Sequence, residues 1–230
     1  MNVLITGGAG FIGSHIAELF LKKKKIKKVV IIDNFKDGNL KNIKSFKNNK
    51  KIQVHKCDIL NKNKISKLFK KINVVIHLAA MSDIVPSIED PINYLNTNIM
   101  GTVNILECMR KNNVNKIIYA ASSSCYGIPK KIPTDENSPI DTRYPYAFSK
   151  YVGELVIKHW SKVYNIKYVS LRLFNVYGTR SRTHGSYGAA LGVFLKQKIN
   201  KKPFTIVGNG RQKRDFVHVS DVSDVFYKCL

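Results

Sequence analysis

The sequence predicts an α/β fold built on a doubly wound parallel sheet with helices on both faces. Runs rich in Val and Ile alternate with helical patterns about every 20 to 30 residues, as in repeated strand–helix–strand units. The apolar runs are nearly continuous rather than alternating, which indicates that helices cover both faces of the sheet. A chain of 230 residues is long enough to bury such a core.

The individual elements follow from these patterns in chain order. Strands are expected over residues 2–6, 28–33, 52–56, 74–80, 116–122 and 168–174. Helices are expected over residues 11–23, 61–71, 90–112 and 145–164. Because the first strand leads through a glycine-rich loop into a helix, we expect a sheet of the Rossmann type.

The alternation of apolar strands and helices ends after residue 178, where the polar stretch TRSRTHGSYG begins. A helix, the segment FTIVG, the strand-like RDFVHV and the amphipathic pattern SDVSDVFYKCL follow. We therefore expect two domains, a Rossmann domain over 1–178 and the start of a smaller lobe over 179–230. This lobe is expected to be incomplete, because the chain stops inside its last helical pattern.

The composition argues against several classes of protein. No apolar run reaches the length of a membrane span and no signal-peptide pattern precedes the first strand, so we expect a cytoplasmic protein with no membrane partner. The cysteines lack the spacing of a disulfide framework or a zinc site, and no metal is expected. The net charge of +24 comes from short lysine runs spread along the whole chain without interleaved aromatic residues, so no nucleic-acid partner is expected.

The stretch ITGGAGFIGSH, residues 5–15, carries one glycine more than a dinucleotide-binding loop needs. Glycines in such a loop let backbone N–H groups approach a pyrophosphate at a helix N-terminus. Read from Gly8 the pattern is G-x-G-x-x-G, and read from Gly7 it is G-x-x-G-x-x-G. Both registers satisfy the same phosphate-binding physics, so the loop alone leaves the choice open.

Asp33 ends the second predicted strand, about 20 residues beyond Gly13, where dinucleotide-binding folds carry an acidic residue. Its carboxylate can accept hydrogen bonds from the adenine ribose and would repel a 2′-phosphate, which favours NAD over NADP. Lys36 lies close by and keeps NADP open as an alternative.

Tyr146 and Lys150 lie four residues apart at the start of a predicted helix, so both side chains share one helix face. A free tyrosine with a pKa near 10 is ionised to only about one part in a thousand at neutral pH. A neighbouring ammonium stabilises the phenolate and brings the tyrosine into the working range of a general base. The hydroxyls of AASSSCYG, residues 120–127, end the preceding strand at the edge of the sheet where doubly wound folds bind ligands.

Taken together, these stretches resemble the extended short-chain dehydrogenase/reductase family, and within it the nucleotide-sugar epimerases and dehydratases. The resemblance rests on TGGAGFIG (6–13), Asp33, CDI (57–59), HLAA (77–80), SSSCYG (122–127), YAFSK (146–150) and LFNVYG (173–178), which occur in collinear order. It implies catalysis by Tyr146, Lys150 and Ser122 on the first domain. It also implies the register of Gly7, Gly10 and Gly13, with Gly8 as a small residue inside the turn.

The resemblance further implies NAD as cofactor and assigns binding residues. The cofactor would be held by Gly7, Gly10, Phe11, Ile12, Gly13, Asp33, Asn34, Asp58, Ile59, Leu78, Ala79, Ala80, Asn98, Tyr146, Lys150 and Phe174. A nucleotide-sugar substrate would be held by Ser122, Ser124, Tyr146, Asn175, Leu191 and Arg214. For Phe174 and Leu191, a place in the apolar core is an equal alternative. A homodimer formed through the helix bearing Tyr146 and the helix over 90–112 is implied in the same way, as is a role in carbohydrate metabolism such as cell-surface polysaccharide synthesis.

Two neighbouring positions bear on the reaction. Family dehydratases carry an acidic pair after the catalytic hydroxyl, and that pair expels water from the sugar, whereas this chain has Ser123 and Ser124 there. Neutral hydroxyls are poor acids and bases for elimination. The expected activity is therefore epimerisation, at C4 of a UDP-hexose, through a transient 4-keto sugar. The alternatives are a dehydratase or another sugar-modifying enzyme of the family, and a non-catalytic NAD-binding fragment.

Overall fold

The computed structural model describes residues 1–181, 190–206 and 208–230, and it contains the expected doubly wound sheet. Six parallel strands lie in the order β3-β2-β1-β4-β5-β6. Their bounds are β1 (Asn2–Thr6), β2 (Lys28–Asp33), β3 (Ile52–Lys56), β4 (Val74–His77), β5 (Lys116–Ser122) and β6 (Lys167–Leu173). The α/β prediction is confirmed, and the strand order reverses direction beside β1, where such folds bind ligands.

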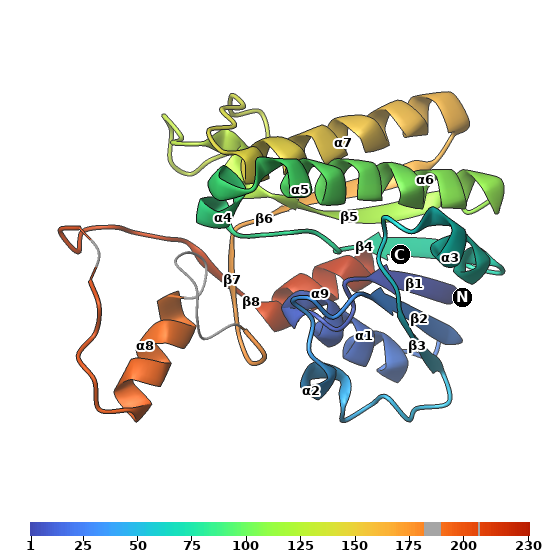
Figure 1. The fold of residues 1–230 in the computed structure, drawn as a ribbon, viewed down its shortest axis with the longest axis horizontal. Helices are drawn as coiled ribbons and strands as arrows, with labels where there is room; N and C mark the ends of the chain where they lie inside the picture. Colours follow the sequence, from blue (N-terminus) through green and yellow to red (C-terminus); the bar gives the residue numbers. More distant parts are fainter. Residues whose placement is uncertain (182–189, 207) are drawn as a thin grey trace.

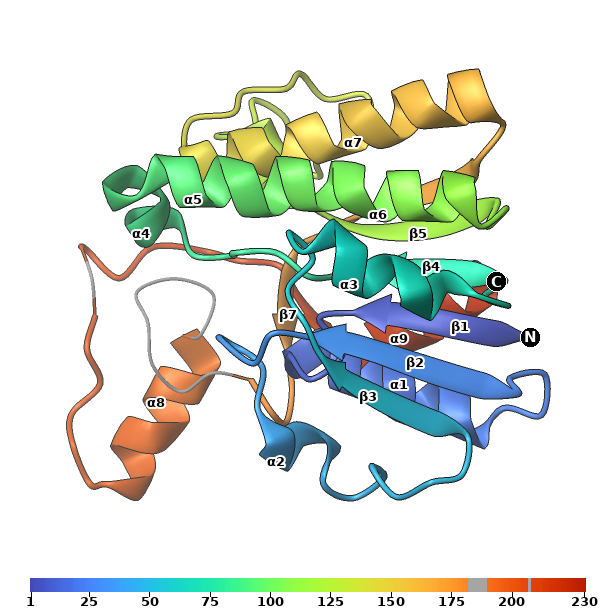
Figure 2. The same cartoon turned by 45° about the vertical axis from the view of Figure 1, so that its right-hand side comes forward.

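Helices cover both faces of this sheet (Figures 1 and 2). One face carries α1 (Phe11–Lys22), the short α2 (Leu40–Ile43) and α9 (Val219–Lys228). The other face carries α3 (Lys62–Ser66) with the 3₁₀ turn η1 (Lys67–Phe69), α6 (Gly101–Lys111) and α7 (Pro145–Tyr164). Alternate residues of each strand enter one of two apolar clusters, so that Ile5 and Ile31 pack with α1 while Leu4 and Val30 pack with α6.

The helical region predicted over 90–112 consists of several pieces. After α4 (Ile84–Glu89), the chain forms α5 (Pro91–Leu95), the π-helical turn η2 (Asn96–Met100) and then α6. Asp90 caps α5 by accepting a hydrogen bond from the Asn93 N–H, and Pro91 occupies the first helical position. Turns of the π type occur frequently at functional sites.

Strand β4 is shorter than predicted, because it ends at His77 rather than at residue 80. The reason is the loss of strand partners on both sides. Gly7, with φ +69°, turns the chain away after β1, and the pairing of β4 with β5 also ends at His77. Residues 78–80 are thereby released from the sheet at its carboxyl edge.

The last part of the chain packs in two places. A short parallel pair that was not predicted joins β7 (Asn175–Tyr177) to β8 (Phe216–His218), while α8 (Ala190–Ile199) lies apart from the sheet (Figure 1). Helix α9 packs on α1, with Val222 and Phe226 buried in the core cluster of the sheet. The predicted loop TRSRTHGSYG falls largely outside the described residues, and the division into domains 1–178 and 179–230 stays a prediction.

Candidate active site

The glycine-rich loop joins β1 to α1, and its glycines have different tasks. A Cβ on Gly7 would lie 2.8 Å from the backbone nitrogen of Ala79, and a Cβ on Gly13 would lie 2.2 Å from the Gly7 carbonyl oxygen. A Cβ on Gly8 would meet the Ile31 side chain at 2.8 Å, so Gly8 faces the core. Gly10 caps α1 and would meet only the Gly7 oxygen, at 3.1 Å, which leaves the helix N-terminus open to an anion. The geometry therefore suits the register of Gly7, Gly10 and Gly13.

The carboxylate of Asp33 closes this loop from the end of β2. Its Oδ2 accepts the Ala9 N–H at 2.9 Å, and its Oδ1 accepts the Phe35 N–H at 2.8 Å. The side chain is buried, and burial raises the pKa of Asp33 against the opposing effect of the two N–H donors. Each oxygen keeps a lone pair, so the carboxylate remains able to accept from a ligand hydroxyl.

Asn34 and Asp58 lie side by side next to Asp33. The Asn34 Nδ2 donates to Asp58 Oδ2 at 2.8 Å, and the Asp58 Oδ1 accepts the Leu60 N–H at 2.8 Å. Ile59 is buried against Gly101, where a Cβ would come within 2.4 Å of the Ile59 Cδ1. The structure thus brings the predicted adenine-end residues together along the carboxyl ends of β2 and β3.

The residues released after β4 form a lip beside the glycine loop. Leu78 and Ala79 donate their backbone N–H groups to the Thr6 hydroxyl, at 3.2 and 3.1 Å. Asn98, in the π-helical turn η2, holds Met81 from both sides: its Oδ1 accepts the Met81 N–H at 2.8 Å and its Nδ2 donates to the Met81 carbonyl at 3.0 Å. Asn98 also donates to Ser149 Oγ at 2.8 Å, so its buried amide is bonded to protein groups.

Ser122, Tyr146 and Lys150 meet at the same edge of the sheet. Ser122 ends β5, and its hydroxyl oxygen accepts from the Ser124 N–H at 3.2 Å and from the Ser124 hydroxyl at 2.8 Å. Tyr146 lies in the first turn of α7, which begins with Pro145 at the first helical position. Burial raises the pKa of Tyr146, while its hydrogen bond with Ser122 lowers it.

Lys150 lies one helical turn further along α7 and is almost fully buried. Burial lowers the pKa of Lys150 to about 7, and the carboxylate of Glu154 acts in the opposite direction. Its Nζ lies 4.1 Å from the centre of the Tyr119 ring. The arrangement supplies a hydroxyl, a phenol and an ammonium in one place, the groups that a proton transfer to or from an alcohol requires.

Four further predicted residues lie after β6: Phe174, predicted to bind the cofactor, and Asn175, Leu191 and Arg214, predicted to bind the substrate. Phe174 follows β6 and is half-exposed, and Asn175 begins β7, where its Nδ2 donates to the Asp215 carbonyl at 2.9 Å. Leu191 lies on α8, and the exposed Arg214 donates to the carbonyl of the preceding residue at 2.8 Å. Among the residues described, no hydrogen bond links these four to Ser122, Tyr146 or Lys150. In the described part of the chain, Ser122 and Tyr146 are hydrogen-bonded to each other, whereas Asn175 and Arg214 donate to backbone carbonyls.

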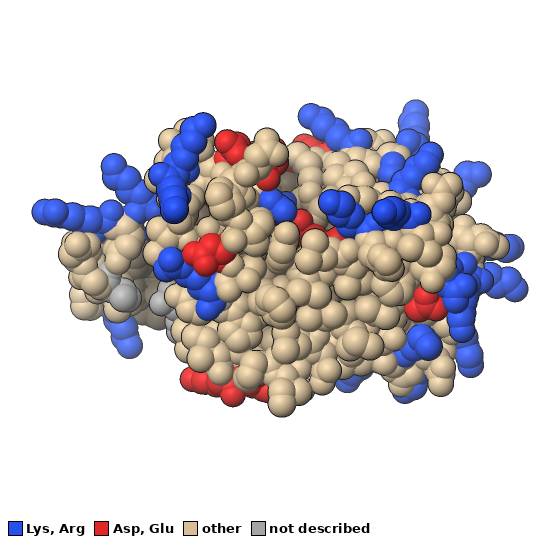
Figure 3. All heavy atoms as spheres, turned by 90° about the horizontal axis from the view of Figure 1, so that it is seen from above, with Lys and Arg blue, Asp and Glu red and all other residues tan. Residues whose placement is uncertain are grey.

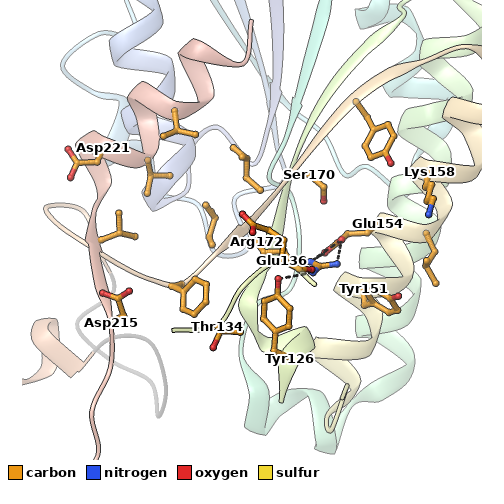
Figure 4. A pocket seen from close by; sticks show the side chains of 18 residues that line it. Tyr126, Thr134, Glu136, Tyr151, Glu154, Lys158, Ser170, Arg172, Asp215 and Asp221 are labelled. Atoms are coloured by element: carbon orange, nitrogen blue, oxygen red, sulfur yellow. Dashed lines mark hydrogen bonds and ion pairs between the residues drawn. The ribbon is translucent and has the colours of Figure 1, made fainter. Parts of the chain in front are cut away.

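A groove of about 720 Å³ lies between α7, β6 and α9, and Phe174 is one of the residues that line it (Figure 4). Arg172 crosses it, bonded to Glu154 at 3.0 Å and to the Tyr126 hydroxyl at 2.7 Å. The remaining ionisable lining is mostly acidic, with Glu136, Asp215 and Asp221. Because carboxylates repel a diphosphate, this groove is unsuited to a nucleotide sugar.

Some residues of the site were given no role in the sequence analysis, although three of them lie inside motifs quoted there. Tyr119 lies under Lys150, and Gly153 makes room for it, since a Cβ there would come within 2.4 Å of the Tyr119 hydroxyl oxygen. Thr6, His77 and Ser149 are buried polar residues at the same edge. The available signal was their position, because Thr6 and His77 both end apolar strands and pair in register.

Charge is scattered over the surface of the molecule. Figure 3 shows Lys and Arg side chains at many separate points of one face, with uncharged surface between them. Within the described ranges, no group of three His, Cys, Asp or Glu residues is placed to hold a metal ion, and no helix is long and apolar enough to cross a membrane.

Comparisons with known proteins agree with this geometry. The profile of the NAD dependent epimerase/dehydratase family matches residues 3–230. A putative UDP-glucose 4-epimerase from Methanocaldococcus jannaschii is 42% identical over 96% of this chain and 70% of its own length. The structure of a UDP-N-acetylglucosamine 4-epimerase from Methanobrevibacter ruminantium M1, in complex with UDP-N-acetylmuramic acid, matches with a TM-score of 0.91 and 33% identity, over 97% of this chain and 70% of that one.

A third match is the UDP-glucose 4-epimerase of Thermus thermophilus, solved in complex with NAD. It is 32% identical, covers 100% of this chain and 74% of that one, and has a TM-score of 0.90. The profile and these relatives span the glycine loop, Asp33, Ser122, Tyr146 and Lys150 in one continuous match. The chain belongs to the NAD dependent epimerase/dehydratase family.

Proposed function

We propose that this protein is an NAD-dependent isomerase that inverts C4 of a UDP-hexose. The observation that carries the proposal is the meeting of Tyr146, Ser122 and Lys150 at the carboxyl edge of the sheet, beside an open glycine loop. Relatives named as UDP-sugar 4-epimerases support the choice of substrate class.

The residues present fit the cofactor. The uncrowded N-terminus of α1 at Gly10 suits a pyrophosphate, and Asp33 offers a carboxylate to a ribose. The lip that begins with Leu78 and Ala79 is bonded to Thr6, directly before this loop. When bound, NAD supplies hydride acceptance from the sugar carbon and hydride return.

The protein's own groups handle the proton and the orientation. Tyr146 removes the proton of the sugar 4-hydroxyl and later returns one, while Ser122 hydrogen-bonds the reacting oxygen. The Lys150 ammonium stabilises the phenolate of Tyr146 through its charge. Arg214 and Asn175, which donate to backbone carbonyls in this structure, carry the N–H groups that would tether the diphosphate while the 4-keto sugar turns over.

Epimerisation is favoured over dehydration by the neutral groups beside Ser122. The hydroxyl of Ser124 donates to Ser122 Oγ at 2.8 Å, so it reinforces the Ser122 position rather than offering an acid or a base. Elimination of water from the sugar requires both a general acid and a general base. The dehydratase therefore remains the second candidate, and a non-catalytic NAD-binding protein the third.

Partners and location are proposed on narrower grounds. We propose a homodimer through the layer formed by α5, η2 and α7, because Ile92, Met100 and Phe148 expose 69%, 48% and 46% of their surface there. A cytoplasmic location, a role in carbohydrate metabolism such as polysaccharide synthesis, and the lack of a nucleic-acid partner stay predictions from the sequence.

The test is an assay of the purified chain, loaded with NAD, first with UDP-galactose and then with UDP-N-acetylgalactosamine. We expect the 4-epimer of at least one sugar and a transient NADH absorbance near the start of turnover. Formation of a 4-keto-6-deoxy sugar would instead identify a dehydratase. NAD binding with neither product would support the non-catalytic alternative for these sugars.

A further inference from the structure

A chain of buried hydrogen bonds crosses the molecule beneath the candidate active site. The His77 Nδ1 lies 2.7 Å from Thr6 Oγ1, and the His77 Nε2 lies 3.0 Å from Thr102 Oγ1. Thr102 in turn donates its hydroxyl proton to the Asn98 carbonyl at 2.6 Å. All four residues are at most 1% exposed, so no solvent competes for these bonds.

The directions of these bonds are fixed by counting protons. Because Thr102 gives its only hydroxyl proton to Asn98, its oxygen must accept from His77, and the His77 Nε2 carries the proton. The Nδ1 is then an acceptor and receives the Thr6 hydroxyl proton, while the Thr6 oxygen accepts the N–H groups of Leu78 and Ala79. The chain is consistent only with a neutral His77 in the Nε2–H tautomer.

The surroundings of His77 keep it neutral. Burial lowers the pKa of His77 to about 3, and the positive charge of Lys150 acts in the same direction. The Tyr119 ring packs against His77 with ring centres 5.6 Å apart, and burial raises the pKa of Tyr119 well above its usual value. The proton order of the chain therefore does not change over the working pH range.

The chain continues from Asn98 to the catalytic helix. The Asn98 amide holds Met81 at its N–H and carbonyl, and donates to Ser149 Oγ at 2.8 Å. Ser149 then donates to the Tyr146 carbonyl at 2.8 Å. One connected set of bonds thus runs from Thr6, directly before the glycine loop, through His77 to the backbone of Tyr146.

We propose that His77 is a positioning residue that sets the cofactor lip, Leu78–Met81, relative to Tyr146 and Lys150. The expected effect on turnover rests on the proposed epimerase function. The expected positions of the lip and of the His77 proton do not depend on that function. His77 bridges β1, β4 and α6 at the level where three parts of the site meet. Its loss leaves the Thr6 hydroxyl proton without its acceptor and the Thr102 oxygen without its donor, and it frees Asn98 and the lip to shift.

The test compares three variants. We expect His77→Leu to lower kcat about 10- to 100-fold, the range seen when supporting hydrogen bonds or sub-ångström placement are lost. The glutamine side chain of His77→Gln has one acceptor and one donor group, as neutral His77 has. We therefore expect His77→Gln to keep most of the rate that His77→Leu loses. Ile105→Ala is the control, because it removes a buried apolar side chain of α6 that takes no part in the hydrogen-bonded chain.

Two readouts do not depend on turnover. In ring-nitrogen NMR spectra of the wild-type protein, His77 should show the Nε2–H tautomer and no titration from mildly acidic to mildly alkaline pH. Amide hydrogen exchange gives the free energy of the opening that exposes the Met81 N–H. In His77→Leu, this free energy should fall by more than the free energy of global unfolding does. In Ile105→Ala, the two losses should be equal.

The Nδ1–H tautomer, titration of His77 near neutral pH, or a Met81 amide that exchanges alike in His77→Leu and Ile105→Ala would overturn the proposal. If His77→Leu does not fold, the ring-nitrogen spectrum of the wild type and the rate of His77→Gln still test the proposal. If the wild type epimerises none of the sugars, the proposed function fails, while the tautomer and the Met81 exchange continue to test His77.

Discussion

The Nζ of Lys150 lies 4.1 Å from the centre of the Tyr119 ring, and two opposing effects act on it there. The ring face attracts the ammonium, whereas burial favours the neutral amine and lowers the pKa of Lys150 to about 7. Lys150 therefore sits near the midpoint of its titration at neutral pH. The charge that stabilises a Tyr146 phenolate is thus held at a cost to the stability of the fold.

That cost predicts a pH dependence of stability. Between pH 7 and the ordinary lysine value of 10.5, the unfolded chain binds a proton at Lys150 that the folded chain has released. The free energy of unfolding must therefore rise with pH in this window, at up to about 1.4 kcal/mol per pH unit, and the gain is lost as the pH falls through 7. Lys150→Met should lack this rise in urea unfolding measured from pH 6 to pH 10. The exposed Lys158→Met is the control, and parallel pH curves for wild type and Lys150→Met would refute the assignment.

Tyr146→Phe keeps the ring and removes the hydroxyl that exchanges the proton. We expect turnover to fall about 10²- to 10⁴-fold, the usual contribution of a general base, with little change in NADH affinity. Turnover and NADH fluorescence titration measure the two quantities. Tyr144→Phe is the matched control, because Tyr144 precedes the same helix and is 42% exposed. Near-normal turnover of Tyr146→Phe would mean that another group is the base.

Gly13→Ala and Gly10→Ala should separate folding from ligand binding. A Cβ at Gly13 would overlap the Gly7 carbonyl, so we expect Gly13→Ala to lower the melting temperature and abolish NAD binding together. A Cβ at Gly10 meets one atom at 3.1 Å, so Gly10→Ala should stay close to wild type in thermal unfolding. It should nevertheless bind NAD more weakly, because the added methyl group obstructs the approach of a pyrophosphate. Equal effects of both substitutions in thermal unfolding would contradict this division.

Arg172 and Glu154 form an ion pair whose side chains are 21% and 12% exposed. Arg172→Met leaves the Glu154 carboxylate buried without its partner, and we expect the free energy of unfolding to fall by about 3 to 5 kcal/mol. The double variant Arg172→Met/Glu154→Gln should recover part of that loss, because no charge remains to be buried. For comparison, Arg110→Met breaks the more exposed pair with Glu107 and should cost about 1 kcal/mol or less. The free energies of unfolding are measured in urea. If the loss in the double variant equals the sum of the losses in Arg172→Met and in Glu154→Gln alone, the two side chains do not couple.

The sequence predicted those parts of the molecule whose signal is local. Runs rich in Val and Ile placed the strands of the main sheet. The signal is strongest in β1, β2, β4 and β5, where nearly every position is buried because helices cover both faces. The end of β4 was misjudged, since Leu78, Ala79 and Ala80 are as apolar as a strand. What ends the strand is the turn of Gly7 on its neighbour, which local sequence does not reveal.

Some residues of the candidate site could likewise be predicted from the sequence, and others could not. Spacing along the chain singled out Asp33, Tyr146 and Lys150 as candidates, whereas the register of Gly7, Gly10 and Gly13 and the role of Ser122 came from the resemblance to the family. His77 and Tyr119 were given no role, because a buried histidine or tyrosine in an apolar strand is usually an ordinary core residue. Their significance comes from partners that lie 25 and 31 positions away along the chain, Thr102 and Lys150.

The strand order has a consequence for how the protein acquires this site. Strand β1 pairs with β4, and its Thr6 bonds to His77, a residue 71 positions later. Long-range pairings of this kind close slowly, because the intervening chain must lose its freedom first. A growing chain that has made only β1, α1 and β2 already contains the glycine loop and Asp33, whereas the lip and Tyr146 have not yet been synthesised. The site is therefore expected to be completed in a late step of folding, together with the closing of the sheet between β1 and β4.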